Sequence, residues 1–169
     1  MRIEADGCVL RPVRDADVQA ITEACLDPEI VRWLPHLPQP YGDGDARSFI
    51  AQTTEGRALG REMTLAIVDD ADALLGMVGV RLTENPPTIG YWLAPRARGR
   101  GLATAATRAL TAWTFATLGP SRIALHAEPG NRASRGVAER CGFRCVPGTI
   151  KGSDGRDLLV FELQRPAGP

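Results

Sequence analysis

A basic, glycine-containing turn, Arg98-Gly99-Arg100-Gly101, lies past the middle of the chain. It follows a short strand-like run, Ile89 to Leu93, and an alanine-rich stretch with helical spacing begins directly after it at Leu102. The first amides of a helix have no acceptor within the helix, and the helix dipole favours negative charge there. Glycines let the backbone approach a ligand closely and adopt positive φ. A strand, a glycine turn and a helix start in this order predict a phosphate site, where arginines 96, 98 and 100 add positive charge.

The spacing within this turn is more specific. Arg98-x-x-Gly101-x-Ala103 resembles the Arg/Gln-x-x-Gly-x-Gly/Ala signature with which the GNAT N-acetyltransferases hold the pyrophosphate of acetyl-CoA. Downstream, Asn131-x-x-Ser134 and Cys141-Gly142-Phe143 resemble the "N-x-x-S … G-F" helix of the same superfamily. The opening Leu10 to Asp17 and the segment Trp33-Leu34-Pro35 are similar to the Rim-type branch, which acetylates ribosomal-protein N-termini. The resemblance covers nearly the whole chain, from residue 8 to residue 163.

A dinucleotide-binding turn is a competing interpretation. That motif requires G-x-G-x-x-G and an acidic residue about 20 positions later. Here Thr104 occupies the place of the third glycine, and the stretch near Ser121 and Arg122 offers no carboxylate. The resemblance to acyl-CoA enzymes is therefore favoured, and a non-catalytic acyl-CoA-binding module stays open as a second class of function.

The resemblance implies a role for each residue around the turn. Leu93 ends the strand whose backbone pairs with the pantetheine arm, Asn131 caps a helix and bonds the cofactor, and Ser134 donates a proton to the leaving thiolate. Many family members carry a tyrosine acid seven residues after the asparagine, but this chain has Ala138 there. A plain exposed serine is the alternative for Ser134. The residues expected to contact acetyl-CoA are Leu93, Arg98, Gly99, Arg100, Gly101, Leu102, Ala103, Asn131 and Ser134.

The general base is less clear from the sequence. Many relatives place a glutamate in or just before the strand that precedes the phosphate turn, where this chain has Thr88 and Gly90. Glu84 and Glu128 are the carboxylate candidates. His126 is a further alternative, although a satisfied strand histidine is the favoured interpretation of it. A weak or water-relayed base suits an α-amine better than a lysine side chain. The pKa of lysine is higher by roughly 2.5 units, so its deprotonation costs about 3.4 kcal/mol more.

A loop with three prolines and a glycine, residues 35–42, carries candidate substrate contacts, because binding residues favour loops. Trp33, His36 and Tyr41 are predicted to contact the acceptor, together with Tyr91 in the strand before the turn. Packing of this loop over the core is the alternative. The predicted activity is transfer of acetyl from acetyl-CoA to a primary amine by direct attack in a ternary complex. The acceptor is a protein N-terminus or, alternatively, a small-molecule amine such as an antibiotic or polyamine.

The composition restricts the class of protein. The 169 residues carry 20 basic and 20 acidic side chains, and a formal net charge of zero argues against a general nucleic-acid binder. The N-terminus has no apolar run typical of a secretory signal, and no stretch reaches membrane-spanning length. The four cysteines have no zinc spacing, so neither a metal nor a structural disulfide is expected. We expect a cytoplasmic bacterial protein, and a homodimer is left open.

The pattern of elements predicts one domain, residues 1–169, of α/β (α+β) class with the GNAT fold. Strands are expected at 8–12, 63–68, 74–82, 89–93, 123–127, 144–146 and 157–163. Helices are expected at 16–26, 29–34, 43–55, 102–118 and 132–140. The resemblance implies a mixed, mostly antiparallel sheet of six to seven strands with helices on both faces, in which the strands at Ile89 and Ile123 separate to admit the pantetheine arm. The tail, 166–169, is expected to fray.

Overall fold

The computed structural model describes residues 1–166, and the expected frayed end at 167–169 lies outside the described residues. Strands and helices alternate along the chain as the sequence predicted, with one additional strand at the start. The elements are β1 (Ile3–Ala5), β2 (Cys8–Pro12), η1 (Asp15–Asp17), α1 (Val18–Cys25), α2 (Pro28–Trp33), α3 (Asp43–Ala58), β3 (Glu62–Val68), β4 (Leu74–Arg81), β5 (Thr88–Leu93), η2 (Pro95–Ala97), α4 (Leu102–Leu118), β6 (Arg122–Ala127), α5 (Arg132–Arg140), β7 (Arg144–Lys151) and β8 (Asp157–Gln164).

The strands form one mixed sheet in the order β1-β2-β3-β4-β5-β6-β8-β7. Every neighbouring pair is antiparallel except β5 and β6, which run parallel. The predicted mixed, mostly antiparallel sheet is confirmed, but the described chain has eight strands and not six to seven. The additional strand, β1, has only three residues, and it is stabilised by pairing with β2 across a turn where Gly7 has φ +73°. Such a short strand has no periodic pattern to detect.

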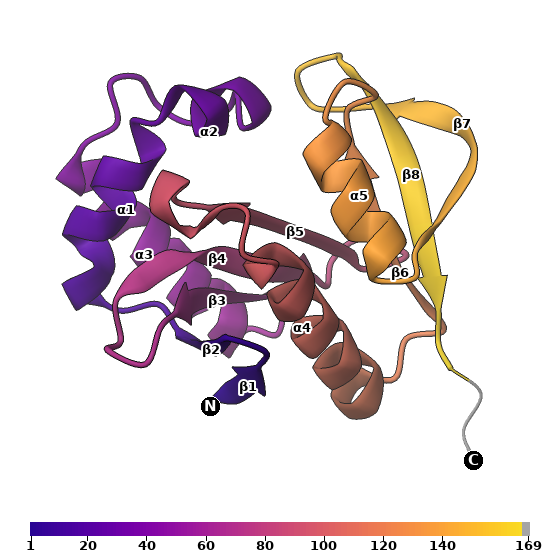
Figure 1. Cartoon of the computed structure of the whole chain (residues 1–169), viewed down its shortest axis with the longest axis horizontal. Helices are drawn as coiled ribbons and strands as arrows, with labels where there is room; N and C mark the ends of the chain where they lie inside the picture. The colour runs from indigo at the N-terminus through magenta and orange to yellow at the C-terminus, as the bar shows by residue number, and fades with distance from the viewer. Residues whose placement is uncertain (167–169) are drawn as a thin grey trace.

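Helices cover both faces of the sheet, as predicted (Figure 1). On one face α1 and α3 bury a core that includes Ile21, Ile50 and Met77. On the other face the core includes Leu110 of α4, Ala138 of α5 and Phe161 of β8. The part of the sheet that ends at β5 and the part that begins at β6 diverge towards α2 and the β7–β8 turn (Figure 1). The parallel pair β5–β6 is therefore the place where the two parts of the sheet meet.

The edge strand β7 is longer than predicted. The sequence placed its end at Val146 because Pro147 and Gly148 are strand breakers. In the structure β7 continues to Lys151, and its pairing with β8 shifts register between Cys145 and Thr149. An irregularity of this kind accommodates a proline and a positive-φ glycine without ending the strand.

A buried ion pair fixes the N-terminal elements. Two nitrogens of Arg11 each donate to a carboxylate oxygen of Asp17 at 2.8 Å, and both residues are buried. Burial raises the pKa of Asp17, but the hydrogen bonds and charges of Arg11 and Arg14 outweigh it and leave that pKa below its usual value. The pair therefore ties β2 to the start of α1 as a charged unit.

Among the described residues, no helix is both long and apolar enough to cross a membrane. The four cysteines are free thiols, two of them buried. Burial raises the pKa of the Cys25 thiol to about 11, so this thiol stays protonated and unreactive near neutral pH.

Candidate functional site

The two parallel strands β5 and β6 pair over only a short distance. In the described chain their register consists of Thr88 opposite Ala124 and Ile89 opposite Leu125. On its other edge β5 stays paired with β4 as far as Leu93, which lies opposite Gly76. From Gly90 to Leu93 the edge that faces β6 therefore presents backbone N–H and C=O groups to no strand. Such an edge can bind an extended, amide-containing ligand.

The N-terminus of α4 lies at the end of this free edge. Gly101 is its N-cap residue with φ +77°, and no side chain of the described residues caps the helix there. The first helical bond runs from the Ala105 amide to the Gly101 carbonyl, so the amides of residues 102–104 have no acceptor within the helix. A Cβ added at Gly99 or Gly101 would meet no atom within 4 Å. The turn before α4 is thus open and rich in free donors, and phosphate binding there stays a prediction.

The arginines of the turn have different positions. Arg98 donates through Nη2 to Asp27 at 2.5 Å and through Nε to the Leu93 carbonyl at 3.3 Å. Arg96 donates to the carbonyl of Leu74 at 2.5 Å. These two side chains fasten the turn to α2 and β4, and all three arginines are exposed. The expected contribution of Arg98 to the phosphate site therefore comes from its backbone, because its charge is already paired with Asp27.

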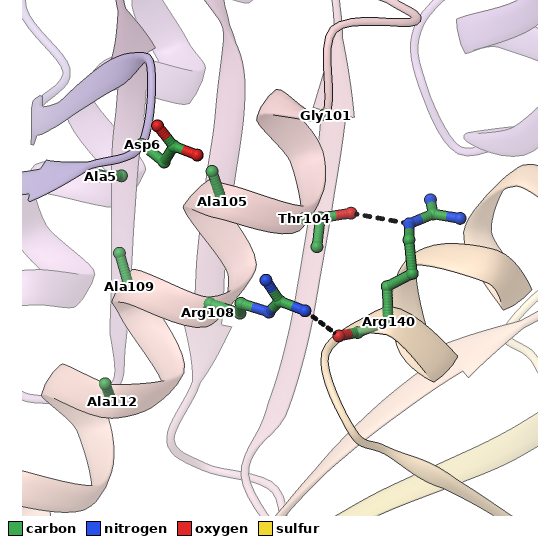
Figure 2. Close-up of a pocket in the computed structure, with 9 residues that line it drawn as sticks. All are labelled: Ala5, Asp6, Gly101, Thr104, Ala105, Arg108, Ala109, Ala112 and Arg140. Carbon is green, nitrogen blue, oxygen red and sulfur yellow. Dashed lines mark hydrogen bonds between the residues drawn. The ribbon is translucent and has the colours of Figure 1, made fainter.

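A hollow of about 540 Å³ adjoins the turn along the outer side of α4. Figure 2 shows α4 between Asp6 of the β1–β2 turn and Arg140 of α5. Arg140 donates through Nε to the Thr104 hydroxyl at 3.2 Å, and Arg108 donates to the Arg140 carbonyl. The hollow continues from Gly101, so it lies where the remainder of a ligand held at the phosphate turn would extend.

The N-terminus of α5 places Ser134. The Asn131 side chain caps this helix by accepting from the Ser134 amide at 3.0 Å, as the sequence predicted. Tyr91 of β5 lies against the core beneath α4 and α5, near the side chain of Ser134. Burial raises the pKa of Tyr91 to about 12, and the nearby Ser134 side chain acts in the opposite direction. The side chains of Tyr91 and Ser134 therefore lie near each other on this side of the separated strands.

The two carboxylates predicted as bases are each paired with arginine. Glu84 accepts from Arg81 at 3.0 Å, just beyond the end of β4. Glu128 accepts from Arg156 at 2.5 Å, and Arg156 also donates to the carbonyl of Arg32 at 3.1 Å. The structure thus joins Glu128 to α2 and to the turn before β8 through one guanidinium. The role of either carboxylate as a base stays a prediction.

The residues predicted to contact the acceptor lie in two different environments, the surface and the core. Trp33 ends α2, its indole donates to Glu29 at 3.2 Å, and a Cβ at Gly130 would lie 4.0 Å from its ring. His36 is exposed on the following loop. Tyr41, in contrast, is 6% exposed and packed with the core under α1 and α3, where burial raises the pKa of its hydroxyl. Packing is the role that the structure describes for Tyr41, so its contact with substrate stays a prediction.

Apart from Gly101, the sequence reasoning singled out none of the residues that line the hollow beside α4. Thr104 and Arg108 follow Gly101 by three and seven positions, which places them on one helix side, so helical spacing was a usable signal. Arg140 and Asp6 gave no such signal, because they approach from distant parts of the chain. Among the described residues, no cluster of His, Cys, Asp and Glu is suited to hold a metal ion.

An open helix N-terminus beside two parted parallel strands defines, with this fold, the class of acyltransferases that take an acyl group from coenzyme A. Residues 8–144 match the family model described as "Acetyltransferase (GNAT) domain". The chain belongs to the GNAT acetyltransferase family.

Two relatives from Bacillus subtilis and one solved structure illustrate this placement. The "Putative ribosomal N-acetyltransferase YdaF" is 47% identical over 98 residues, a match that spans 54% of each chain. The "Uncharacterized N-acetyltransferase YnaD" is 25% identical and covered over 96% of each chain. The structure of Mycobacterium smegmatis RimJ in complex with CoA-disulfide superposes with a TM-score of 0.82 at 24% identity, over 97% of this chain and 86% of that one. This last likeness concerns the fold.

Proposed function

We propose that this protein transfers acetyl from acetyl-CoA to a primary amine, by direct attack of the amine on the thioester in a ternary complex. The observation that carries the proposal is the uncapped N-terminus of α4, next to the free edge of β5. The thioester of acetyl-CoA supplies an activated acyl group. None of the four cysteines lies between the separated strands in a motif that calls for a nucleophile, which favours direct transfer over an acyl-enzyme.

The chain's own residues divide the binding of acetyl-CoA into three parts. The amides of residues 99–103 hold the pyrophosphate at the helix N-terminus. The free edge of β5, through Leu93, pairs with the amides of the pantetheine arm. Arg108 and Arg140 border the hollow in which the adenosine and its 3′-phosphate lie, because a guanidinium is suited to bind phosphate.

Ser134 and Tyr91 act on the thiol side of the reaction. The Asn131 cap fixes the first turn of α5 and with it the Ser134 hydroxyl. A proton given by Ser134 as the C–S bond breaks stabilises the transition state more than the ground state. Tyr91 lies near this hydroxyl on the same side of the strands.

The acceptor that we favour is the α-amine of a protein N-terminus. Two observations support it: the name of YdaF, which is that of a ribosomal N-acetyltransferase, and the chemistry of the amine. An α-amine with a pKa near 8 is partly neutral at pH 7, whereas lysine near 10.4 is not. The exposed His36 and the partly exposed Trp33 at the end of α2 offer contacts for a peptide.

An amine panel tests both parts of the proposal. The purified protein is incubated with acetyl-CoA and one of three kinds of acceptor. The first is a peptide with a free N-terminus, the second is a peptide with an acetylated N-terminus and a free lysine side chain, and the third is a polyamine or an aminoglycoside. Release of free thiol is followed. Thiol release with the free N-termini alone is expected. Thiol release only with the small amines would show that the acceptor is a small molecule and not a protein N-terminus. No thiol release with any amine would contradict catalysis and leave only acyl-CoA binding.

A further inference from the structure

One of the two histidines lies at the point where the parallel strands separate. Ala124 of β6 is opposite Thr88 of β5, and Leu125 is opposite Ile89. Side chains alternate between the two faces of a strand, so His126 projects from the same face as Ala124 and Thr88. Gly90 lies on that same face, one position past the last residue of β5 that pairs with β6. His126 therefore borders the gap in which the thioester would lie.

The space on this face of β5 is open. Gly90 is exposed, and a Cβ added there would meet no atom within 4 Å. Its partner on β4 is Gly79, so two adjacent strands lack side chains at this level of the sheet. A side chain at Gly90 would stand between the gap and the solvent, whereas glycine leaves room for an amine beside His126.

The imidazole and the hydroxyl pair lie on opposite faces of the gap. Tyr91 follows Gly90 and so points to the other face, where it packs with the core beneath α4 and α5 and meets Ser134. An amine that approaches from the His126 face would attack the thioester from one side. The thiolate would then receive its proton on the other side. The structure thus separates the two proton transfers in space.

Charged groups surround His126 on several elements. Arg81 and Glu84 lie at the end of β4, Arg122 pairs with Glu162 at 3.2 Å across β6 and β8, and Glu128 pairs with Arg156 beyond the end of β6. Burial lowers the pKa of His126, Glu84 raises it and Arg81 lowers it, and the result is below the ordinary value. The imidazole is accordingly neutral at pH 7 and able to accept a proton, whereas Glu84 and Glu128 are already engaged by arginine.

We propose that His126 is the general base of the acetyl transfer, an inference that rests on the proposed function. An imidazole nitrogen takes one proton from the substrate ammonium and later releases it to solvent. The lone pair of the resulting amine forms the C–N bond to the thioester carbon. The C–S bond breaks, and its electron pair leaves on sulfur. Ser134 gives its proton to the thiolate, the second proton lost from nitrogen passes through solvent to restore the Ser134 hydroxyl, and one proton is released per acetyl group.

The test compares His126→Gln with the parent enzyme, using a free-N-terminus peptide and acetyl-CoA. At saturating substrates the parent kcat should fall on the acid side, with an apparent pKa below about 6.5. In His126→Gln this decline of kcat at acid pH should disappear, and kcat itself should fall by about 10²-fold or more. Its affinity for CoA, measured by calorimetry, should stay within about twofold of the parent. Glu55→Gln is the control for the loss of one polar side chain, since Glu55 is exposed on α3, and it should keep both the rate and the decline of kcat at acid pH.

A second measurement does not depend on activity. The imidazole of His126 is titrated by NMR, with its signals assigned from the variant that lacks it. A pKa below about 6.5 is expected, and an imidazole still protonated at pH 7 would overturn the base role. If the parent transfers acetyl and His126→Gln keeps both the kcat of the parent and its decline at acid pH, the base assignment alone is wrong. If the parent releases no thiol with any amine, the proposed function fails, and the base role with it.

Discussion

The two helices that flank the parted strands begin in opposite ways. At α4 the N-cap is a positive-φ glycine without a capping side chain, and the first amides stay free. At α5 the N-cap is Asn131, whose side chain accepts from the Ser134 amide. An uncapped N-terminus gives up about 1 kcal/mol of helix stability but provides donors for an anion. A capped one provides no free site, and instead fixes the position of a side chain in its first turn.

The largest expected effect is at the uncapped helix. Gly101→Glu places a side chain and a negative charge in the space of the pyrophosphate, and it strains a residue with φ +77°. We expect the Kd for CoA to rise by about 10²-fold or more, measured by calorimetry. The matched control is Gly60→Glu, which also replaces a positive-φ glycine with open space around it. It should lower the melting temperature similarly without weakening CoA binding. Equal CoA affinity in Gly101→Glu and the parent would show that the phosphate site is elsewhere.

The second effect is at the side chain that the capped helix positions. Ser134→Ala should lower kcat by at most about 10²-fold, because a thiolate with a pKa near 8.5 is a fair leaving group without help. CoA affinity should be nearly intact. Ser153→Ala, a change at an exposed serine before β8, serves as the control. An unchanged kcat would exclude the acid role, and loss of CoA affinity alone would reassign Ser134 to binding.

A smaller effect is expected in the hollow beside α4. Arg108→Ala removes one guanidinium next to the proposed site of the 3′-phosphate. The Kd for CoA should rise about fivefold, in line with about 1 kcal/mol for a partly exposed charged contact. The Kd for dephospho-CoA, which lacks that phosphate, should hardly change. Arg47→Ala on α3 is the control for loss of one exposed charge. Equal losses for both ligands would place Arg108 outside the phosphate contact.

The smallest effect is at the cap itself. Asn131→Ala should lower the free energy of unfolding by about 1 kcal/mol, measured by urea denaturation, because the Ser134 amide loses its acceptor. Asn131→Asp keeps an oxygen in place and should retain the stability. If Asn131→Ala were as stable as the parent, the capping bond would have no net value, and the contrast between the two helix starts would lose its energetic basis.

Most of the secondary structure could be predicted from the sequence, since its signals are local. The helices at 102–118 and 132–140 have the predicted bounds, because Gly101, Gly119 and Asn131 set them within one turn. The prediction of β7 was too short, and β1 was missed, because both strands depend on a partner strand more than on their own pattern.

The candidate site was predicted in part. The cap at Asn131 was predicted from residues close together in sequence, and so was the glycine turn before α4, whose binding of phosphate stays a prediction. Other features depend on residues far apart, such as the pairing of Arg98 with Asp27, 71 positions away. Tyr91 was predicted as an acceptor contact, but the structure describes it beside Ser134, because the alternation of β5 points it towards α5.

By itself, the sequence determined the elements, the open start of α4 and the family resemblance, because these depend on propensities and motifs a few residues long. Only the tertiary structure decided the insertion of β8 between β6 and β7, the early separation of β5 from β6, and the positions of His126 and Ser134 on opposite faces of the gap. Strand order and pairing length are set by packing over the whole sheet. No local stretch of residues contains that information.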